Sequence, residues 1–186
     1  MVFVLTEQTV SRPGPSDDEV FRAAAAGDPD ARDDLYRRYR RVVHGVVLGV
    51  TGPGDVEDVT QEVFMVVFDK LQTVRDSEAF AGWVCSVARH VAIDHARKRS
   101  RTPDHEPLGD VSSRRDDPAR TTAHQILEHI RALPEAYREP LILRLVEGMT
   151  GPEIAEHTGM THGSVRVNLC KGMALLRPAL ERSGLP

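Results

Sequence analysis

The chain has 186 residues with a formal net charge of −4, so it can form one large domain or two small ones. The negative charge excludes a general polycation, and any contact with nucleic acid must come from local basic patches. Cys85 and Cys170 form no CxxC pair. We therefore expect neither a disulfide framework nor a zinc ribbon, and a reducing compartment fits.

The first ten residues, MVFVLTEQTV, contain a short apolar run without a basic segment before it. This pattern is not typical of a signal peptide. No apolar stretch approaches the roughly 20 residues that cross a bilayer. We expect a soluble, cytoplasmic protein.

Four helices are predicted in the N-terminal half. Residues 1–15 end in SRPGP and are expected to form a disordered tail. Ser16 begins S-D-D-E, a capping box, and Asp28 can cap a second helix whose first residue is Pro29. The expected helices span residues 17–26, 29–50, 55–71 and 78–100, with breaks at Gly27 and at TGPG (51–54).

Acidic residues cover the outer face of the predicted helix at 55–71. The usual interpretation of such a face is solvation, and acids in a first turn also favour the helix dipole. A docking surface for a basic partner is the alternative. No histidine lies among these acids and no Glu-x-x-His pair is present, so we expect no metal site. The acids are Asp55, Glu57, Asp58, Glu62 and Asp69.

Basic residues gather toward the end of the predicted helix at 78–100. Cations near a helix C-terminus stabilise it by about 0.3–1 kcal/mol each, but this cluster exceeds what capping needs. It indicates a surface that contacts phosphates. The apolar residues Phe80, Trp83, Val84, Val87 and Val91 are expected on one face, and we assign Trp83 to the core before DNA stacking. The basic residues are Arg89, His90, His95, Arg97, Lys98, Arg99 and Arg101.

Residues 101–121 are rich in Pro, Asp, Ser and Arg without an apolar period, which indicates a linker and a domain boundary. A second helical region follows. One helix should end near Leu133, and Pro134 should start the next, which Gly148 closes. The apolar residues of that next helix are Tyr137, Leu141, Ile142, Leu145 and Val146.

Residues 150–177 are predicted to form two helices with a tight turn, the pattern of a helix-turn-helix. Thr150 and Glu153 form a capping box, Gly159 suits a left-handed turn, and Thr161 can cap the second helix. A helical hairpin in a bundle core is the structural alternative. In the DNA-binding interpretation the second helix enters the major groove. Its outward residues are His162, Ser164, Arg166, Asn168 and Lys171.

Three stretches in this order resemble extracytoplasmic-function (ECF) sigma factors of the sigma-70 family. DVEDVTQEVFMVVFDKL (55–71) is similar to the region 2 helix that binds core RNA polymerase. FAGWVCSVARHVAIDHARKRSR (80–101) is similar to the helix that melts and reads the minus-ten element. The stretch at 132–169 is similar to region 4, which reads the minus-thirty-five element.

The resemblance implies an all-α fold of two small helical domains joined by a flexible linker. The domains would span 16–100 and 122–183, with 101–121 between them. The function implied is promoter-specific initiation with core RNA polymerase, which contacts the chain through its β′ clamp helices and β flap. An anti-sigma partner is also expected, and neither enzymatic chemistry, a cofactor nor a metal is implied.

Roles for individual residues also follow from the resemblance. Polymerase binding would fall to Asp58, Gln61 and Glu62. The basic helix, together with the preceding loop at 72–77, would engage the non-template strand. The residues proposed to contact the downstream element are Arg89, His90, Arg97, Lys98 and Arg99, and those for the upstream element are His162, Ser164, Arg166, Asn168 and Lys171.

The sequence departs from the family at three positions. Asn168 and Met173 stand where basic residues are usual, which predicts weaker and less salt-dependent DNA binding by this domain alone. His90 stands where Asn is common. The alternative functions are a free-standing helix-turn-helix regulator, and a helical enzyme with His157, His162 and Cys170 as metal ligands.

Overall fold

The computed structural model describes residues 16–74, 76–101 and 118–185, and the regular structure within them is entirely helical. This confirms the all-α prediction. The expected tail at 1–15 and most of the expected linker lie outside the described residues. The helices are α1 (Asp17–Ala25), α2 (Pro29–Thr51), α3 (Val56–Lys70), the 3-10 turn η1 (Leu71–Thr73), α4 (Phe80–Arg101), α5 (Pro118–Arg131), α6 (Glu135–Leu145), α7 (Gly151–Thr158) and α8 (His162–Arg182).

The caps predicted at the helix starts are present. Ser16 and Thr150 each form a capping box, and the Asp28 carboxylate accepts from the N–H of Asp30 at 2.9 Å. Asp55 is different, because it precedes α3 but makes no side-chain cap. η1 occupies the start of the segment expected to be a loop, and α5 begins at Pro118, before the expected second domain.

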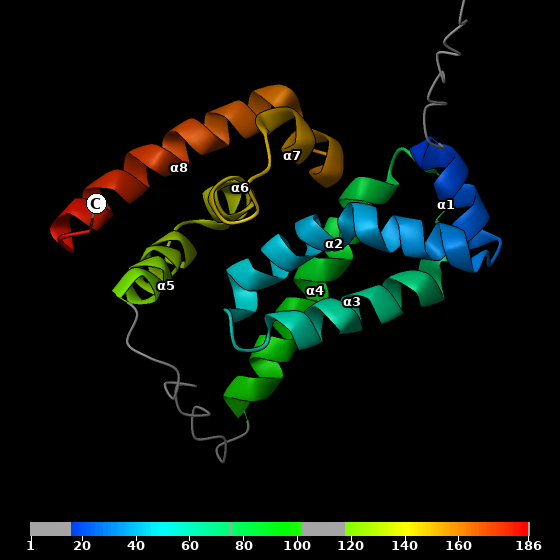
Figure 1. The fold of residues 1–186 in the computed structure, drawn as a ribbon, viewed down its shortest axis with the longest axis horizontal. Helices are drawn as coiled ribbons and strands as arrows, with labels where there is room; N and C mark the ends of the chain where they lie inside the picture. The colour runs from blue at the N-terminus through cyan, green and yellow to red at the C-terminus, as the bar shows by residue number, and fades with distance from the viewer. Residues whose placement is uncertain (1–15, 75, 102–117, 186) are drawn as a thin grey trace, which may run out of the picture.

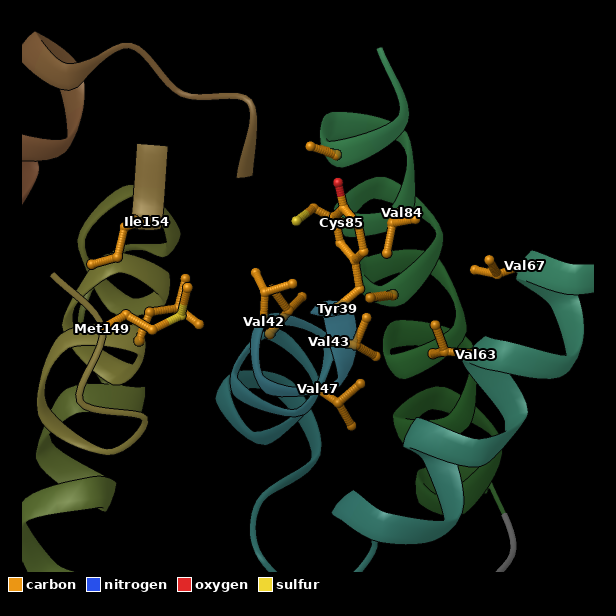
Figure 2. Packing of buried hydrophobic residues seen from close by; sticks show 14 of the residues in the cluster. Tyr39, Val42, Val43, Val47, Val63, Val67, Val84, Cys85, Met149 and Ile154 are labelled. Atoms are coloured by element: carbon orange, nitrogen blue, oxygen red, sulfur yellow. The ribbon is translucent and has the colours of Figure 1, made fainter. Parts of the chain in front are cut away.

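The N-terminal half packs around α2, which contacts α1, α3 and α4. Val42, Val43 and Val47 of α2 are fully buried. Figure 2 shows Val43 and Val47 on the side of α2 that faces α4 and α3, whereas Val42 lies on the side toward Met149 and Ile154 of the C-terminal half. α2 therefore buries apolar side chains on two of its sides, one against α3 and α4 and the other against the C-terminal half.

The buried face of α4 differs from the one predicted. Trp83, Val87 and Val91 are only partly buried, whereas Cys85, Ala88 and Ala92 are completely buried, together with Val84. α4 is packed between α2, α3 and α7, and small side chains allow helices to approach closely. The apolar stripe alone did not reveal this, since alanine carries little hydrophobic signal.

The C-terminal half packs around α6, which contacts α5, α7 and α8. Leu141, Ile142 and Leu143 are fully buried, but Leu145 and Val146 are 49% and 48% exposed. Two of the apolar residues noted in the sequence, Leu145 and Val146, therefore lie on the surface and not in the core. The reason is that α6 is covered on opposite sides by α8 and α2, as Figure 1 shows, so the buried face is not a single stripe.

The two halves form one continuous core, in which α6 packs on α2 and α7 packs on α4. Two glycines make this close approach possible. A Cβ at Gly45 of α2 would lie 2.6 Å from Leu143 Cδ2, and one at Gly159 would lie 3.2 Å from Gly82 Cα of α4. The sequence predicted two domains and a linker, but not this interface.

Candidate nucleic-acid interface

The helix-turn-helix consists of α7, a short turn and α8. Gly159 adopts the left-handed conformation at φ 73°, where glycine carries no Cβ penalty. The hydroxyl of Thr161 accepts the N–H of Ser164 at 3.1 Å and begins α8. Ile154 and Val165 are buried on the facing sides of the two helices. The turn and both caps thus orient α8 as the sequence predicted.

The predicted DNA-reading residues lie mostly on the surface of α8. His162, Ser164, Arg166 and Lys171 are exposed, and Asn168 is half-buried. The Ser164 hydroxyl lies 2.8 Å from that of Thr161, so Ser164 is partly engaged in the cap. The remaining exposed side chains give the surface of α8 two cations and polar groups that can meet base edges.

The acidic face of α3 divides into paired and solvent-facing carboxylates. Glu57 lies 3.2 Å from Arg40 and 3.6 Å from His44, so it joins α3 to α2. Asp58 and Gln61 are exposed, and Glu62 is half-buried. The residues predicted to bind polymerase are therefore accessible to a partner, whereas Glu57 is engaged by α2.

Met65 shares this face of α3 and was missed by the sequence reasoning. Its side chain is 66% exposed, and it follows Gln61 by four residues, which places the two one helical turn apart. Met65 lies within the apolar run VFMVV (63–67), and an apolar residue inside such a run gives no separate signal of exposure. Exposed methionine is common on protein-binding surfaces.

The basic end of α4 is exposed and connected to α3. Arg97, Lys98 and Arg99 lie on the surface, and Arg99 forms an ion pair with Asp55. Arg97 lies 3.8 Å from Asp94. His90 is also exposed, with its Nδ1 2.7 Å from the carbonyl oxygen of Ser86. Asp55 and Asp94 neutralise part of this charge through these two pairs. The end of α4 thus remains a positively charged surface.

Arg89 lies apart from that positive surface, at the interface between the halves. Its Nε donates to Glu139 Oε2 at 2.9 Å, and Glu135 lies 3.8 Å away. Burial has the largest single effect and lowers the pKa of Arg89, but the hydrogen bond to Glu139 together with the nearby charges of Glu139 and Glu135 outweighs it, so the net pKa is raised. The arginine is therefore charged and engaged by α6 in this structure.

The outer face of α8 lies apart from the other two predicted surfaces, whereas the end of α4 adjoins the start of α3 through Arg99 and Asp55. The face of α3, the end of α4 and the outer face of α8 do not meet in one cleft, and α6 separates α8 from α2 in Figure 1. Among the described residues, no group of three or more His, Cys, Asp and Glu side chains could hold a metal ion. Within that same part of the chain, no helix is both long and apolar enough to span a membrane.

Comparison with known proteins gives matches along most of the chain. Residues 35–102 match the model of sigma-70 region 2, and residues 123–176 match that of sigma-70 region 4. The RNA polymerase sigma factor SigV of Bacillus subtilis is 30% identical over 139 residues, covering 73% of this chain and 82% of SigV. The ECF sigma factor ShbA of Streptomyces griseus is 31% identical over 180 residues, covering 86% and 92% of the two chains.

One solved structure supports the same fold. CnrH, solved in complex with the cytosolic domain of CnrY, has a TM-score of 0.62 and 22% identity, covering 89% of this chain and 97% of CnrH. At this identity the likeness concerns the fold alone.

Proposed function

This chain belongs to the extracytoplasmic-function class of the sigma-70 family and directs promoter-specific transcription initiation, and we propose that three separate surfaces divide that work. One binds core RNA polymerase, one opens the promoter, and one reads the upstream element. The observation that carries this division is the separation of an exposed acidic face, an exposed basic helix end and an exposed recognition helix on one chain.

The polymerase-binding surface comprises Asp58, Gln61, Glu62 and Met65 on α3. Its carboxylates carry the charge opposite to a basic partner, and the exposed methionine adds an apolar contact at its edge. Charged residues around an apolar contact give specificity and fast association. The β′ clamp helices are the partner we assign to this surface.

The promoter-opening surface lies at the end of α4. His90, Arg97, Lys98 and Arg99 are exposed there and can bind the phosphates of the displaced non-template strand. Flipping a base out of the stack costs a few kcal/mol, which phosphate contacts offset in part. No bond is made or broken in this step, so the chain acts as a binding factor and needs no nucleophile.

The upstream-element surface is the outer face of α8, with His162, Ser164, Arg166, Asn168 and Lys171. Asn168 is half-buried and Met173 is apolar, so two positions that are usually basic add no charge. Tethering to polymerase compensates, because it raises the effective concentration of α8 near the DNA. This explains how a less cationic helix can still select promoters.

Two more partners fit the described surfaces of region 4. The β flap would contact this domain, and an anti-sigma protein would hold the chain inactive, as the complex of CnrH with CnrY suggests by its composition. Because the polymerase and promoter of a bacterium are cytoplasmic, we place the protein in the cytoplasm.

Run-off transcription tests the proposed function. Core polymerase would be combined with genomic promoter fragments, with and without the full chain. Discrete transcripts that require the chain support the proposal and reveal the promoter. Specific DNA shifts by the chain alone, without polymerase binding, would favour a free-standing helix-turn-helix regulator instead.

A further inference from the structure

The apolar side chain of Val167 lies on the outer surface of α8, among the residues that we assign to DNA. Val167 is 48% exposed. α8 packs on α5, α6 and α7, and Figure 1 shows it at the edge of the molecule with α6 on its inner side. Val165 and Gly172 of the same helix are buried. Packing within region 4 therefore accounts for those two residues but not for Val167.

Helical spacing places Val167 at the centre of this outer surface. Residues three and four positions away share a side of a helix. Asn168 lies three residues after the buried Val165 and four before the buried Gly172, so it is half-buried. The outermost side chain at this level of α8 is thus the valine and not the asparagine. The corresponding neighbours of Val167 are all exposed, namely Gly163, Ser164, Cys170 and Lys171.

The turn of α8 that precedes Val167 leaves its methyl groups accessible. Helical side chains point back toward the N-terminus, so the valine lies over the turn that contains Gly163. A Cβ at Gly163 would meet only Thr161 Oγ1, at 3.9 Å, and glycine itself has no side chain to cover the valine. The Ser164 hydroxyl is engaged in the cap, 2.8 Å from that of Thr161. The leading part of α8 therefore presents an apolar contact to whatever it meets.

A methyl group in the major groove complements such a contact. Thymine carries a C5-methyl group there, and apolar side chains recognise it. The polar edges of the other bases would lose water against valine without gaining a hydrogen bond. Arg166 precedes Val167 directly, and its guanidinium can bond guanine in two places. Lys171 lies one turn later on the same side, so cations flank the apolar contact.

We propose that Val167 is a specificity-determining residue, and that it selects a thymine of the upstream element by contact with the C5-methyl group. This inference rests on the assignment of α8 to the upstream element under the proposed function, and it names a base that the element contains. Asn168 and Met173 carry no charge, so a contact of this kind gives the helix selectivity without added cations. An apolar contact releases no counterions, and its contribution is therefore independent of salt.

Replacing thymine with uracil isolates the methyl group, because uracil keeps the pairing with adenine and the O4 acceptor. The probe would be a promoter fragment identified by run-off transcription, with each thymine of its upstream element, on either strand, replaced in turn. The dissociation constant of the holoenzyme is measured for each fragment. In the wild type we expect one uracil to weaken binding roughly fourfold, the loss expected for one buried methyl group, equally at low and high salt.

Val167→Ser tests whether the valine makes this contact. Serine and valine have similar helix propensities and the site is exposed, so α8 should remain folded. The variant should bind the thymine fragment roughly fourfold more weakly and lose its response to that uracil, so that the two changes together cost no more than either alone. Val167→Ile keeps an apolar side chain and should retain the response.

Leu175→Ser is the matched control on the same helix. Leu175 is 47% exposed, almost the same as Val167, but it lies about 12 Å further along α8. The N-terminal part of a recognition helix is the part that contacts base edges. We therefore expect Leu175→Ser to respond to uracil as the wild type does.

Two results would overturn this inference and leave the proposed function standing. One is a response to uracil in Val167→Ser equal to that of the wild type. The other is wild-type binding that no uracil weakens, although scrambling the upstream element still reduces transcription by the holoenzyme. Transcription that a scrambled element does not affect would reject both the assignment of α8 and the role of Val167.

Discussion

Asp55, which precedes α3, forms an ion pair with Arg99 near the end of α4. His95 of α4 also lies 3.7 Å from the same carboxylate. The acid expected to contribute to the helix dipole instead joins the proposed polymerase-binding helix to the proposed promoter-opening helix. One negative charge therefore sits inside a surface that we assign to phosphate binding.

Removing that charge should strengthen phosphate binding by α4. We expect Asp55→Asn to increase the affinity of the holoenzyme for single-stranded downstream DNA, with a steeper salt dependence, and to change stability by at most about 1 kcal/mol because the pair is partly exposed. Fluorescence anisotropy against salt concentration measures this. Asp69→Asn removes an exposed acid from the far end of α3, and an equal increase with that variant would show that net charge alone is responsible.

Two cations on α8 should determine recognition of the upstream element. Replacing Arg166 and Lys171 with Ala should weaken binding to promoters that depend on this element by roughly 10-fold or more, since a base-reading arginine contributes about 1–3 kcal/mol. Core polymerase binding should survive. Run-off transcription and polymerase pull-down measure the two effects, with Arg182→Ala as the control. Loss of polymerase binding in the double variant would contradict the assignment.

Charge reversal on α3 should remove binding to core polymerase, which the changes on α8 should leave intact. Asp58→Lys with Glu62→Lys should abolish polymerase binding without unfolding the bundle, because neither side chain is buried. Reversal of Asp30 and Asp33, two exposed acids of α2, is the control. Size-exclusion chromatography with core polymerase reports the complex. Co-elution of the α3 variant with polymerase would exclude this surface.

The contact between His44 of α2 and Glu147, which lie 2.6 Å apart, should stabilise the folded chain less as pH rises. The hydrogen bond to Glu147 raises the pKa of His44, burial opposes it, and Glu57 adds to the rise while Arg40 opposes it. A raised pKa means that protonated His44 stabilises the folded chain fully below its ordinary value of about 6.5 and loses this contribution as pH passes the raised pKa.

Urea unfolding of the wild type and of His44→Gln, followed from pH 5.5 to 8.5, measures this contribution. The wild type should be the more stable at the low end of the range, and the difference in the free energy of unfolding should shrink as pH rises. A difference that does not change with pH would assign the contribution to another group.

A second glycine tests the packing inside region 4. A Cβ at Gly172 of α8 would lie 2.8 Å from Leu141 Cδ1 and 3.2 Å from Tyr137 Cβ. Gly172→Ala should destabilise this half by about 1–2 kcal/mol, because overpacking costs about 1–3 kcal/mol and helix propensity returns only part of it. Urea unfolding measures the change. Gly163→Ala, also in α8, meets only Thr161 Oγ1 at 3.9 Å and should be neutral or stabilising.

Local signals along the chain determined the helices and the character of their exposed surfaces. The capping boxes at Ser16 and Thr150, the cap at Asp28 and the turn at Gly159 depend on neighbours within a few residues. The same is true of the polar residues of α8, whose exposure follows from their alternation with the buried Val165 and Gly172 of the same helix. Such features are readable because both partners of each contact lie in the same short stretch.

Only the tertiary structure decided which side of each helix is buried and how the two halves pack against one another. Leu143, Glu139 and Arg89 acquire their roles because α6 is packed between α8 and α2. Met65 is likewise exposed because α2 and α4 do not cover its side of α3. These relationships join residues distant in sequence, and periodicity cannot report a contact whose other partner lies on a separate helix.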